Sequence, residues 1–316
     1  GTEPTVTDAN VVLGRIDPAR FLGGEMSLDA EAASDAVQRL ADRLGLGLLE
    51  AAEGVIKIVD ANMAAAIRSR TIQKGHDPRD FALVALGGAG PLHAASLAET
   101  LDVPEVLVPA YPGITAAMGL LTSDLKYDQM RTAFMVEGAI DAARLDRELA
   151  EMEAELRGVL EADGVAPGEI RVVAGLDCRY VGQGYELRVL LPTGRFAPEA
   201  LEEFHRLHEL EYGHASRDPI QIVNLRVTAS GRRPALERLP VRPGTLEAAS
   251  LGSGEAVFRV DGSLQPLETA YYDRARLPLE TPVAGPAIVF QRDTTILVPP
   301  GWSARADEGG NLILSR

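Results

Sequence analysis

One short segment constrains the fold more than any other. The apolar run from Phe81 to Leu86 stops at a glycine-rich turn, Gly87-Gly-Ala-Gly90, and Pro91 follows at once. Such an apolar run is typical of a strand buried on both faces. Proline suits the first turn of a helix, where the free N–H groups favour anions. The segment therefore predicts a strand, a tight turn and a helix, which is how many nucleotide sites are built.

Two familiar nucleotide patterns are absent from this turn. Gly88-Ala-Gly90-Pro-Leu-His93 lacks the third glycine of the dinucleotide fingerprint, and no Gly-Lys-Ser/Thr follows as in a P-loop. Glycines without Cβ let the backbone lie against a ligand and adopt positive φ. The same residues also suit a tight strand-to-helix turn that binds nothing, so both interpretations stay open from the turn alone.

The first part of the chain has the pattern of an α/β domain. Apolar residues at helical spacing predict helices over 27–44 and 48–70, and Gly45 and Gly75 end them. A strand over 81–86, a helix over 91–101 and a strand over 106–108 form a βαβ unit. A short Ala-rich helix over 113–121 and an extended segment over 124–136 complete this part.

Two further regions follow. The first has the pattern of an α+β domain, with helices over 141–162 and 198–212, strands over 170–181, 185–191 and 220–230, and a hairpin turn at Gly182-Gln-Gly184. Past Gly231-Arg-Arg-Pro234 the segments are short, alternating and proline-rich, which predicts a small all-β domain. We therefore expect domains over 1–136, 137–233 and 234–316.

Composition excludes some classes of partner and site. The formal net charge of −15 and the pI of about 4.8 leave no basic surface for nucleic acid or for an anionic membrane. No apolar run is long enough to span a membrane. The single cysteine, Cys178, rules out an intrachain disulfide and fits a reducing cytoplasm. A chain that begins at Gly1, without an initiator methionine, is expected to be processed, cut or truncated.

Six ordered segments resemble one known family. They are Gly1-Thr-Glu-Pro-Thr-Val-Thr-Asp-Ala-Asn10, Asp77-Pro-Arg-Asp80, Gly87-Gly-Ala-Gly-Pro-Leu-His-Ala94, Pro112-Gly113 with Ala116 to Leu121, Arg179-Tyr-Val-Gly-Gln183 and Gly285-Pro-Ala-Ile288. Together they resemble the recurring segments of the hydantoinase A and 5-oxoprolinase group, which includes the ATP-hydrolysing subunits of acetone and acetophenone carboxylases.

The resemblance implies an α/β chain that is the second half of an actin-like ATPase fold, followed by the α+β and all-β domains. It places Gly87, Gly88, Ala89 and Gly90 on the adenosine side of bound ATP, with Mg²⁺ as the accompanying ion. The family's phosphate-binding Asp-x-Gly-Gly-Thr turn is nowhere in this sequence. Because that segment supplies phosphate and Mg²⁺ ligands, we expect the fragment alone to be inactive.

The resemblance also implies the reaction and the partners. The leading hypothesis is an ATP-dependent hydrolase of cyclic amides, such as hydantoins or 5-oxoproline, that works as an oligomer with a hydantoinase B-type large subunit or domain. One alternative is the ATPase subunit of a ketone carboxylase. Another is an assembly module whose nucleotide surface is idle.

Two side chains are candidates for catalysis. His93 lies three residues past Gly90 and is close enough to reach a ligand, or else it bonds a neighbouring backbone carbonyl and fixes the loop. Asp8, with Asn10, could line the cleft, but both residues are equally suited to capping a helix. Arg68 and Arg70 could meet phosphate, although cations at a helix end more often complement its dipole.

The sequence predicts no metal site within this chain. His205 and His208 share a helix face and His214 follows, but the spacing is not His-Glu-x-x-His, and solvated surface histidines are the favoured interpretation. Cys178 falls in a predicted strand with no histidine near it in sequence, so a buried apolar role is favoured over a nucleophile.

Overall fold

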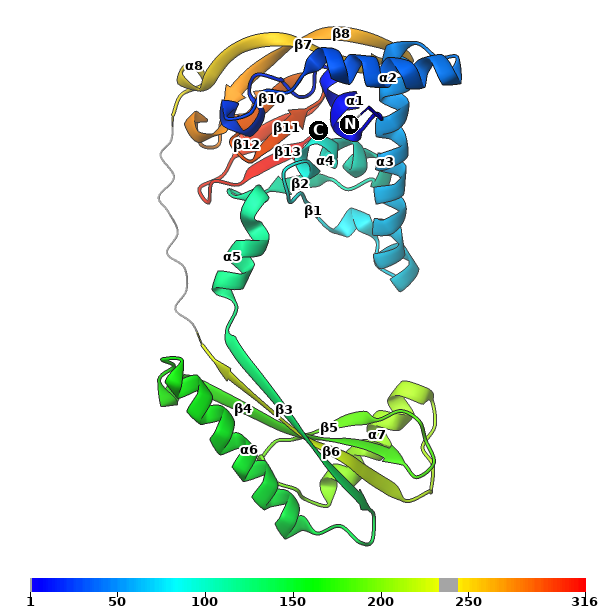
Figure 1. Ribbon diagram of the computed structural model, residues 1–316, viewed down its shortest axis with the longest axis vertical. Coiled ribbons are helices and arrows are strands. Elements are labelled where there is room, and N and C mark those ends of the chain that lie inside the picture. Colours follow the sequence, from blue (N-terminus) through cyan, green and yellow to red (C-terminus); the bar gives the residue numbers. More distant parts are fainter. Residues whose placement is uncertain (1, 233–243) are drawn as a thin grey trace. The chain divides into compact units, whose positions relative to one another are not determined.

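The computed structural model describes residues 2–232 and 244–316, which form two compact units (Figure 1). The first unit consists of Gly1–Met118 together with Arg238–Arg316, and the second of Gly119–Glu237. The second unit is therefore inserted in the sequence of the first. The predicted domain boundary at 233/234 lies outside the described residues.

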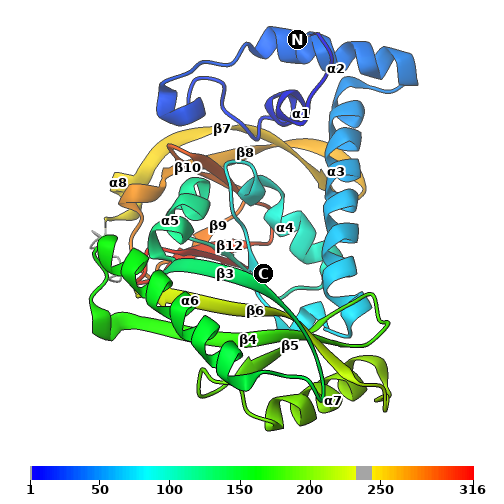
Figure 2. The ribbon, with the colours of Figure 1, turned by 60° about the horizontal axis from the view of Figure 1, so that its bottom comes forward.

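Three helices open the first unit. They are α1 (Val6–Val12), α2 (Ala30–Leu44) and α3 (Leu48–Arg70). All three pack together around a small core that includes Ala9, Leu13 and Val37 (Figure 2). The helix predicted over 48–70 is confirmed at both ends, and α2 begins at the Asp29 cap, two residues later than the predicted Ser27.

The first sheet carries the glycine turn. Its order is β1-β2-β13-β12-β9, with bounds Leu83–Val84, Glu105–Val108, Leu312–Ser315, Ser303–Ala306 and Val283–Ala284. Strands β1 and β2 are parallel and are joined by α4 (Gly90–Leu101), so the predicted βαβ unit is confirmed. The other neighbours pair antiparallel.

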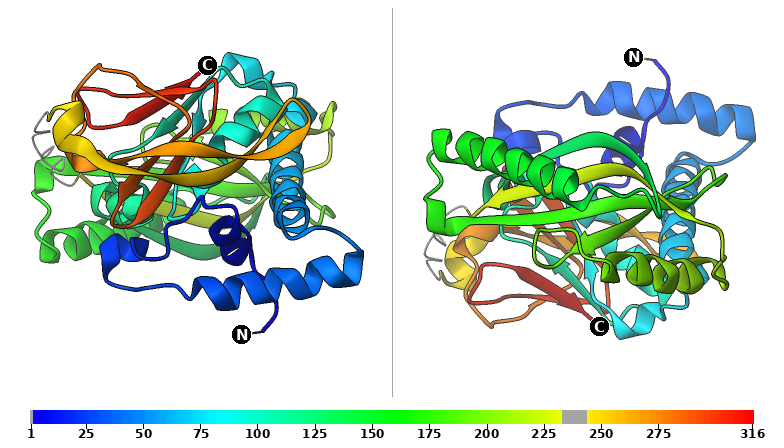
Figure 3. Two further views of the ribbon diagram at one scale, coloured as in Figure 1. Left: turned by 90° about the horizontal axis from the view of Figure 1, so that it is seen from above. Right: turned by 90° about the horizontal axis from the view of Figure 1, so that it is seen from below.

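A second sheet in this unit has the order β11-β10-β8-β7. Its bounds are Thr294–Val298, Ala287–Gln291, Ser263–Asp273 and Ser250–Val260, and β7 follows the short helix α8 (Leu246–Ala249). Strands β7 and β8 form a long twisted ribbon (Figure 3). One core joins Val289 and Ile296 of this sheet to α4 and to the first sheet.

The strands after residue 243 do not form a domain of their own, unlike the prediction. β9, β12 and β13 complete the sheet of β1 and β2, and β11 packs against α4. The sequence also gave no signal for β9 or β12. Short alternating segments leave a local pattern in the sequence, so the all-β character of this region could be predicted. Pairing between strands some two hundred residues apart leaves no such pattern, so the partner strands could not be predicted.

The prediction that the segment 81–86 is buried on both faces is wrong, because several of its side chains are exposed. Phe81, Val84 and Leu86 are 52%, 51% and 46% exposed, while Ala85 is buried. The reason is topological, because β1 is an edge strand whose outer side pairs with no described residue.

The second unit is an antiparallel sheet with two helices on one face. The sheet order is β3-β6-β4-β5, with bounds Leu125–Val136, Ile220–Gly231, Ile170–Tyr180 and Leu187–Leu191. The helices are α6 (Ala142–Ala162) and α7 (Glu199–Tyr212), and their apolar sides meet one face of the sheet in a single core. The α+β pattern predicted for this region is confirmed. Helix α5 (Thr115–Thr122) precedes β3 in sequence.

No helix in the part of the chain that the structure describes is both long and apolar enough to cross a membrane.

Candidate functional site

The glycine turn forms an open corner between β1 and α4. Gly87 has φ +82°, a left-handed conformation that side chains rarely adopt, and a Cβ built on it would meet nothing within 4 Å. Gly88 and Ala89 are exposed. The corner is therefore bare main chain that faces solvent, as a surface for a flat ligand requires.

The corner also carries the start of α4. Gly90 is the first residue of this helix, Pro91 the second, and no side chain caps the helix start at Ala89. Pro91 has no N–H group, and the Leu92 N–H donates to the Ala89 carbonyl at 3.0 Å, so the first turn of α4 keeps few N–H groups for a ligand. The partial positive charge of the helix start still favours a polar or anionic group there.

Hydrogen bonds from two distant segments hold the corner in shape. The Gly87 N–H donates to the Pro112 carbonyl at 2.8 Å, and the Thr294 hydroxyl donates to the Gly88 carbonyl at 2.9 Å. The Asp293 carboxylate accepts from the Gly113 N–H at 3.0 Å. Gly113 is required here, because a Cβ would lie 2.3 Å from the Asp293 Oδ2 atom.

A half-buried arginine, Arg274, anchors the segment that leads to Pro112. Arg274 donates to the carbonyls of Val108 and Pro109 at 2.8 and 2.7 Å, and also to Gln291 at 2.8 Å. The Gln291 side chain in turn donates to the Ala110 carbonyl at 2.9 Å. Burial lowers the pKa of the Arg274 guanidinium to about 10, which reflects how far this anchor is removed from water.

Sequence reasoning missed all four residues of this support, namely Arg274, Gln291, Asp293 and Thr294. They lie some two hundred residues from Gly87, and nothing local links them to it. The only available signal was a polar hairpin turn, Gln291-Arg-Asp-Thr294, inside an otherwise apolar strand pair.

His93 is buried and faces α3. Its Nδ1–H donates to the Asp60 carboxylate at 2.7 Å, and the two side chains are 5% and 10% exposed. The expected alternative was a bond to a backbone carbonyl, and the structure has a carboxylate in that place. A His–carboxylate pair of this kind fixes the ring orientation and the tautomer.

Other charges lie near this pair. The Glu53 carboxylate accepts from Arg259 and Lys57, and the Arg259 hydrogen bond lowers the pKa of Glu53. Burial lowers the pKa of Arg15, although Asp60 and Glu53 attract its charge. These side chains tie α3 to β7 and to the loop after α1, so the network supports the first unit.

Asp8 forms a capping box with Thr5. Its carboxylate accepts from the Thr5 N–H at 2.8 Å, and its own N–H donates to the Thr5 hydroxyl at 3.2 Å. Asn10 is buried and donates to the Val6 carbonyl at 3.0 Å. The Asp8 arrangement corresponds to the helix-capping interpretation of the sequence, whereas Asn10 lies inside α1 and caps neither end. The structure does not bring Asp8 together with His93 or the glycine corner through any contact among the described residues.

Arg68, a candidate phosphate ligand, donates to the Thr100 carbonyl near the end of α4 at 3.0 Å. It thus satisfies a carbonyl at a helix end, as cations in that position commonly do.

Of the three histidines of the second unit, His208 is buried, His205 is half-buried and His214 is exposed, so the expectation of solvated histidines is wrong for His208. His208 is 1% exposed; its Nδ1–H donates to the His214 carbonyl at 2.7 Å, and its Nε2 accepts from the Gln183 amide at 2.8 Å. His205 bonds the Tyr180 hydroxyl at 2.5 Å. Among the described residues, no three His, Cys, Asp or Glu side chains gather to hold a metal ion.

Cys178 is fully buried in the core of this unit. Burial raises the pKa of its thiol to about 12, and the neighbouring Asp177 charge adds to the effect. A thiol in this state is not a nucleophile at neutral pH.

Sequence families match almost the whole chain. Residues 1–129 match the family described as Hydantoinase/oxoprolinase, and residues 136–314 match the Hydantoinase/oxoprolinase C-terminal domain.

Two curated relatives have named activities. The caprolactamase subunit alpha of Pseudomonas jessenii is 33% identical over 97% of this chain and 45% of its own length. The acetophenone carboxylase gamma subunit of Aromatoleum aromaticum is 34% identical over 99% of this chain and 45% of its own length. The chain thus spans less than half the length of these relatives.

Two solved structures share the fold. A nucleotide-free acetone carboxylase structure matches with a TM-score of 0.81 and 25% identity, over 98% of this chain and 46% of that chain. The ATP-dependent caprolactamase of Pseudomonas jessenii matches with a TM-score of 0.72 and 32% identity, over 100% of this chain and 47% of that chain. The predicted α/β fold class is therefore confirmed.

Proposed function

Because the chain belongs to the hydantoinase/oxoprolinase family, we propose that it is the nucleotide-contacting half of an ATP-dependent enzyme that hydrolyses cyclic amides. The observation that carries this proposal is the open glycine corner at the start of α4, held in shape by Asp293, Thr294 and Arg274. The solved caprolactamase, described as ATP-dependent, supports it through its likeness over the whole chain.

The residues of the corner fit one side of ATP. Gly88 and Ala89 are exposed, Gly87 and Gly90 are half-buried, and none of the four carries a bulky side chain; the start of α4 adds partial positive charge. When bound, ATP would supply the phosphoryl group that turns the amide oxygen into a leaving group. Gly87 to Gly90 would bind and orient the nucleotide, and the Asp60–His93 pair would fix the helix beneath them. A catalytic role for His93 or Asp8 stays a prediction.

The described residues do not fit a complete Mg²⁺ site, since no acidic cluster accompanies the corner. We therefore assign the Mg²⁺ and phosphate ligands to the part of the relatives that this chain does not span. On this proposal the 316-residue chain alone binds the nucleotide weakly and does not hydrolyse it. We place the enzyme in the cytoplasm, in a complex with a hydantoinase B-type subunit, because its named relatives are subunits.

A second candidate function is the ATPase subunit of a ketone carboxylase. The observation that favours it is the higher structural similarity to acetone carboxylase, with a TM-score of 0.81 against 0.72 for caprolactamase. The full-length complex separates the two candidates: phosphate release stimulated by hydantoins or lactams supports the hydrolase, and stimulation by bicarbonate plus a ketone supports the carboxylase.

Calorimetric titration of ATP into the chain tests the nucleotide site. We expect a measurable heat for the native sequence and at least tenfold weaker binding for Gly87→Ala, whose new Cβ would enter the open surface. Gly75→Ala is a matched control, because Gly75 also has φ +82° and open space around its Cβ but lies outside the corner. Both variants should lose about 1 to 2 kcal/mol of stability from backbone strain.

Binding that is absent in the native chain, or equally weakened in both variants, would contradict the nucleotide role of the corner. Absent binding, together with tight association with the B-type subunit, would instead favour the assembly module.

A further inference from the structure

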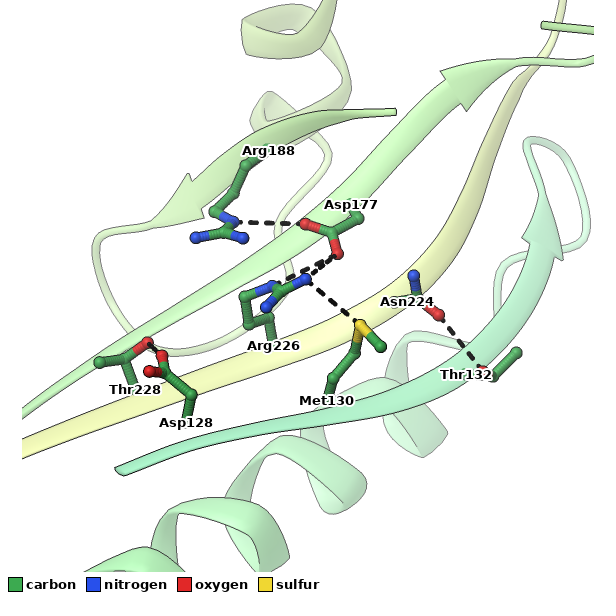
Figure 4. A network of polar contacts seen from close by, with 8 residues as sticks. All are labelled: Asp128, Met130, Thr132, Asp177, Arg188, Asn224, Arg226 and Thr228. Carbon is green, nitrogen blue, oxygen red and sulfur yellow. Dashed lines mark hydrogen bonds and ion pairs between the residues drawn. The ribbon is translucent and has the colours of Figure 1, made fainter. Parts of the chain in front are cut away.

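One face of the sheet in the second unit has no cover within that unit. Side chains alternate along each strand, and those on one face meet α6 and α7 in the core. The side chains on the opposite face come from all four strands, and several are drawn in Figure 4. An antiparallel sheet can expose one face to water, in which case that face is usually polar.

Exposed apolar side chains flank the centre of this open face. Register pairing places Met130, Arg226, Gly175 and Leu190 in one row across β3, β6, β4 and β5. Met130 and Leu190 are each 56% exposed, and Val173 in the neighbouring row is 50% exposed. Large apolar side chains half in water, and gathered on one face, mark an interaction surface more often than a solvated one.

A glycine in the row, Gly175, lies between Leu190 and Arg226 and carries no side chain. A Cβ on Gly175 would lie 3.0 Å from the Val189 carbonyl oxygen, so a larger residue would disturb the pairing of β4 with β5. The Arg188 side chain would lie 3.5 Å from the same Cβ, so Gly175 leaves room for this arginine beside the Leu190 and Arg226 side chains.

A buried carboxylate fixes two arginines at this centre. Asp177 is 7% exposed and accepts from Arg188 Nε at 3.3 Å and from Arg226 Nη2 at 3.0 Å (Figure 4). Arg226 Nη2 also lies 3.2 Å from the Met130 sulfur. With two guanidinium groups and one carboxylate, the cluster has surplus positive charge in a chain whose formal net charge is −15.

We infer that this face, centred on Arg188, Leu190, Met130 and Arg226, is the docking surface for the partner subunit, and that the partner presents carboxylates around an apolar side chain. Exposed apolar side chains around ordered arginines are a composition found in protein interfaces, where arginine is enriched. The surplus positive charge selects an acidic partner surface. This inference rests on the proposed function, which supplies the partner subunit.

Binding of the purified B-type subunit to this chain, measured by calorimetry at two salt concentrations, tests the inference. Leu190→Asp removes the apolar contact, and Arg188→Glu reverses an exposed charge. The matched controls are Leu210→Asp and Arg206→Glu, both at exposed positions on α7. We expect at least tenfold weaker binding for the first pair, unchanged binding for the controls, and a salt dependence that Arg188→Glu reduces.

Four other results would overturn the inference, and they differ in what else they affect. Equal affinity in all variants would refute this surface and leave the proposed function standing. No complex with the native chain would refute both. A lower unfolding midpoint for Leu190→Asp than for Leu210→Asp in the chain alone would show that the chain covers its own face. If the native chain forms a dimer in sedimentation experiments and Leu190→Asp abolishes that dimer, the face binds a second copy of this chain.

Discussion

At the scale of single residues, burial decides which reactive groups are available for chemistry. Cys178 and His208 both have reactive side chains, yet the first lies in the core and the second has both ring nitrogens bonded. Asp177 is also buried, but it holds two arginines at the surface. Burial therefore makes Cys178 and His208 unavailable for chemistry, whereas the buried Asp177 fixes the positions of Arg188 and Arg226.

The raised pKa of Cys178 predicts a change in stability at alkaline pH. Because the folded pKa of about 12 exceeds the unfolded value of 9.0, the thiol favours folding below pH 9, and this contribution is lost as pH rises towards 12. In urea titrations above about pH 9.5, the unfolding free energy of the native chain should fall more steeply than that of Cys178→Ala, by up to about 1.4 kcal/mol per pH unit.

Equal slopes in the two proteins would mean that the thiol titrates alike in the folded and unfolded chain. A thiol reagent gives an independent reading: at pH 8 it should label Cys178 only after unfolding in guanidinium chloride.

At the scale of elements, β1 is a strand whose apolar sequence predicts burial although it is partly exposed in the structure. Val84 is 51% exposed, whereas Val106 on the neighbouring strand β2, opposite Leu83, is fully buried. In this chain Val84→Thr should cost less than about 0.5 kcal/mol of unfolding free energy, since threonine suits an exposed strand. Val106→Thr should cost about 1 to 3 kcal/mol, because it buries a hydroxyl group. Chemical denaturation of both variants checks the difference.

The same two variants test the two-lobed architecture that the proposed function implies. In a full-length form carrying the remainder of the relatives' length, the cost of Val84→Thr should approach that of Val106→Thr, because the apolar edge is then covered. A cost that stays small in the full-length protein would show that β1 remains an exposed edge.

The helices and the glycine corner could be predicted from sequence because their signals are local. The 3.6-residue period of the segment 48–70 and the glycines at 87, 88 and 90 each act within a few residues. The support of the corner could not be predicted, since Arg274 and Asp293 meet Val108 and Gly113 only through the pairing of distant strands. Asp60 was missed for a similar reason, as nothing in the sequence links α3 to His93.

At the scale of the whole molecule, the two units have separate cores. The core of the second unit draws only on residues between 125 and 229, and the other cores draw on none of them. Leu149 and Leu314 are equivalent test positions, one in each unit, at 2% and 0% exposure.

Scanning calorimetry should therefore resolve two unfolding transitions. Leu149→Ala should lower the midpoint temperature of only one transition, and Leu314→Ala that of only the other. Each substitution should reduce the unfolding free energy of its own unit by about 2 to 5 kcal/mol, because it creates a cavity. A single transition that both substitutions shift equally would show that the units unfold as one.

The ladder between β3 and β6 has a consequence for how this chain can change. Its first pair joins Leu125 to Gly231, so the backbone enters the inserted unit and leaves it at directly opposed residues. An inserted unit whose two ends lie side by side can become longer or shorter, or be replaced by another unit, without a change in the path of the backbone on either side of it. Selection can therefore remodel the surface of the inserted unit while the residues that support the glycine corner, which lie before and after this unit in the sequence, stay in register.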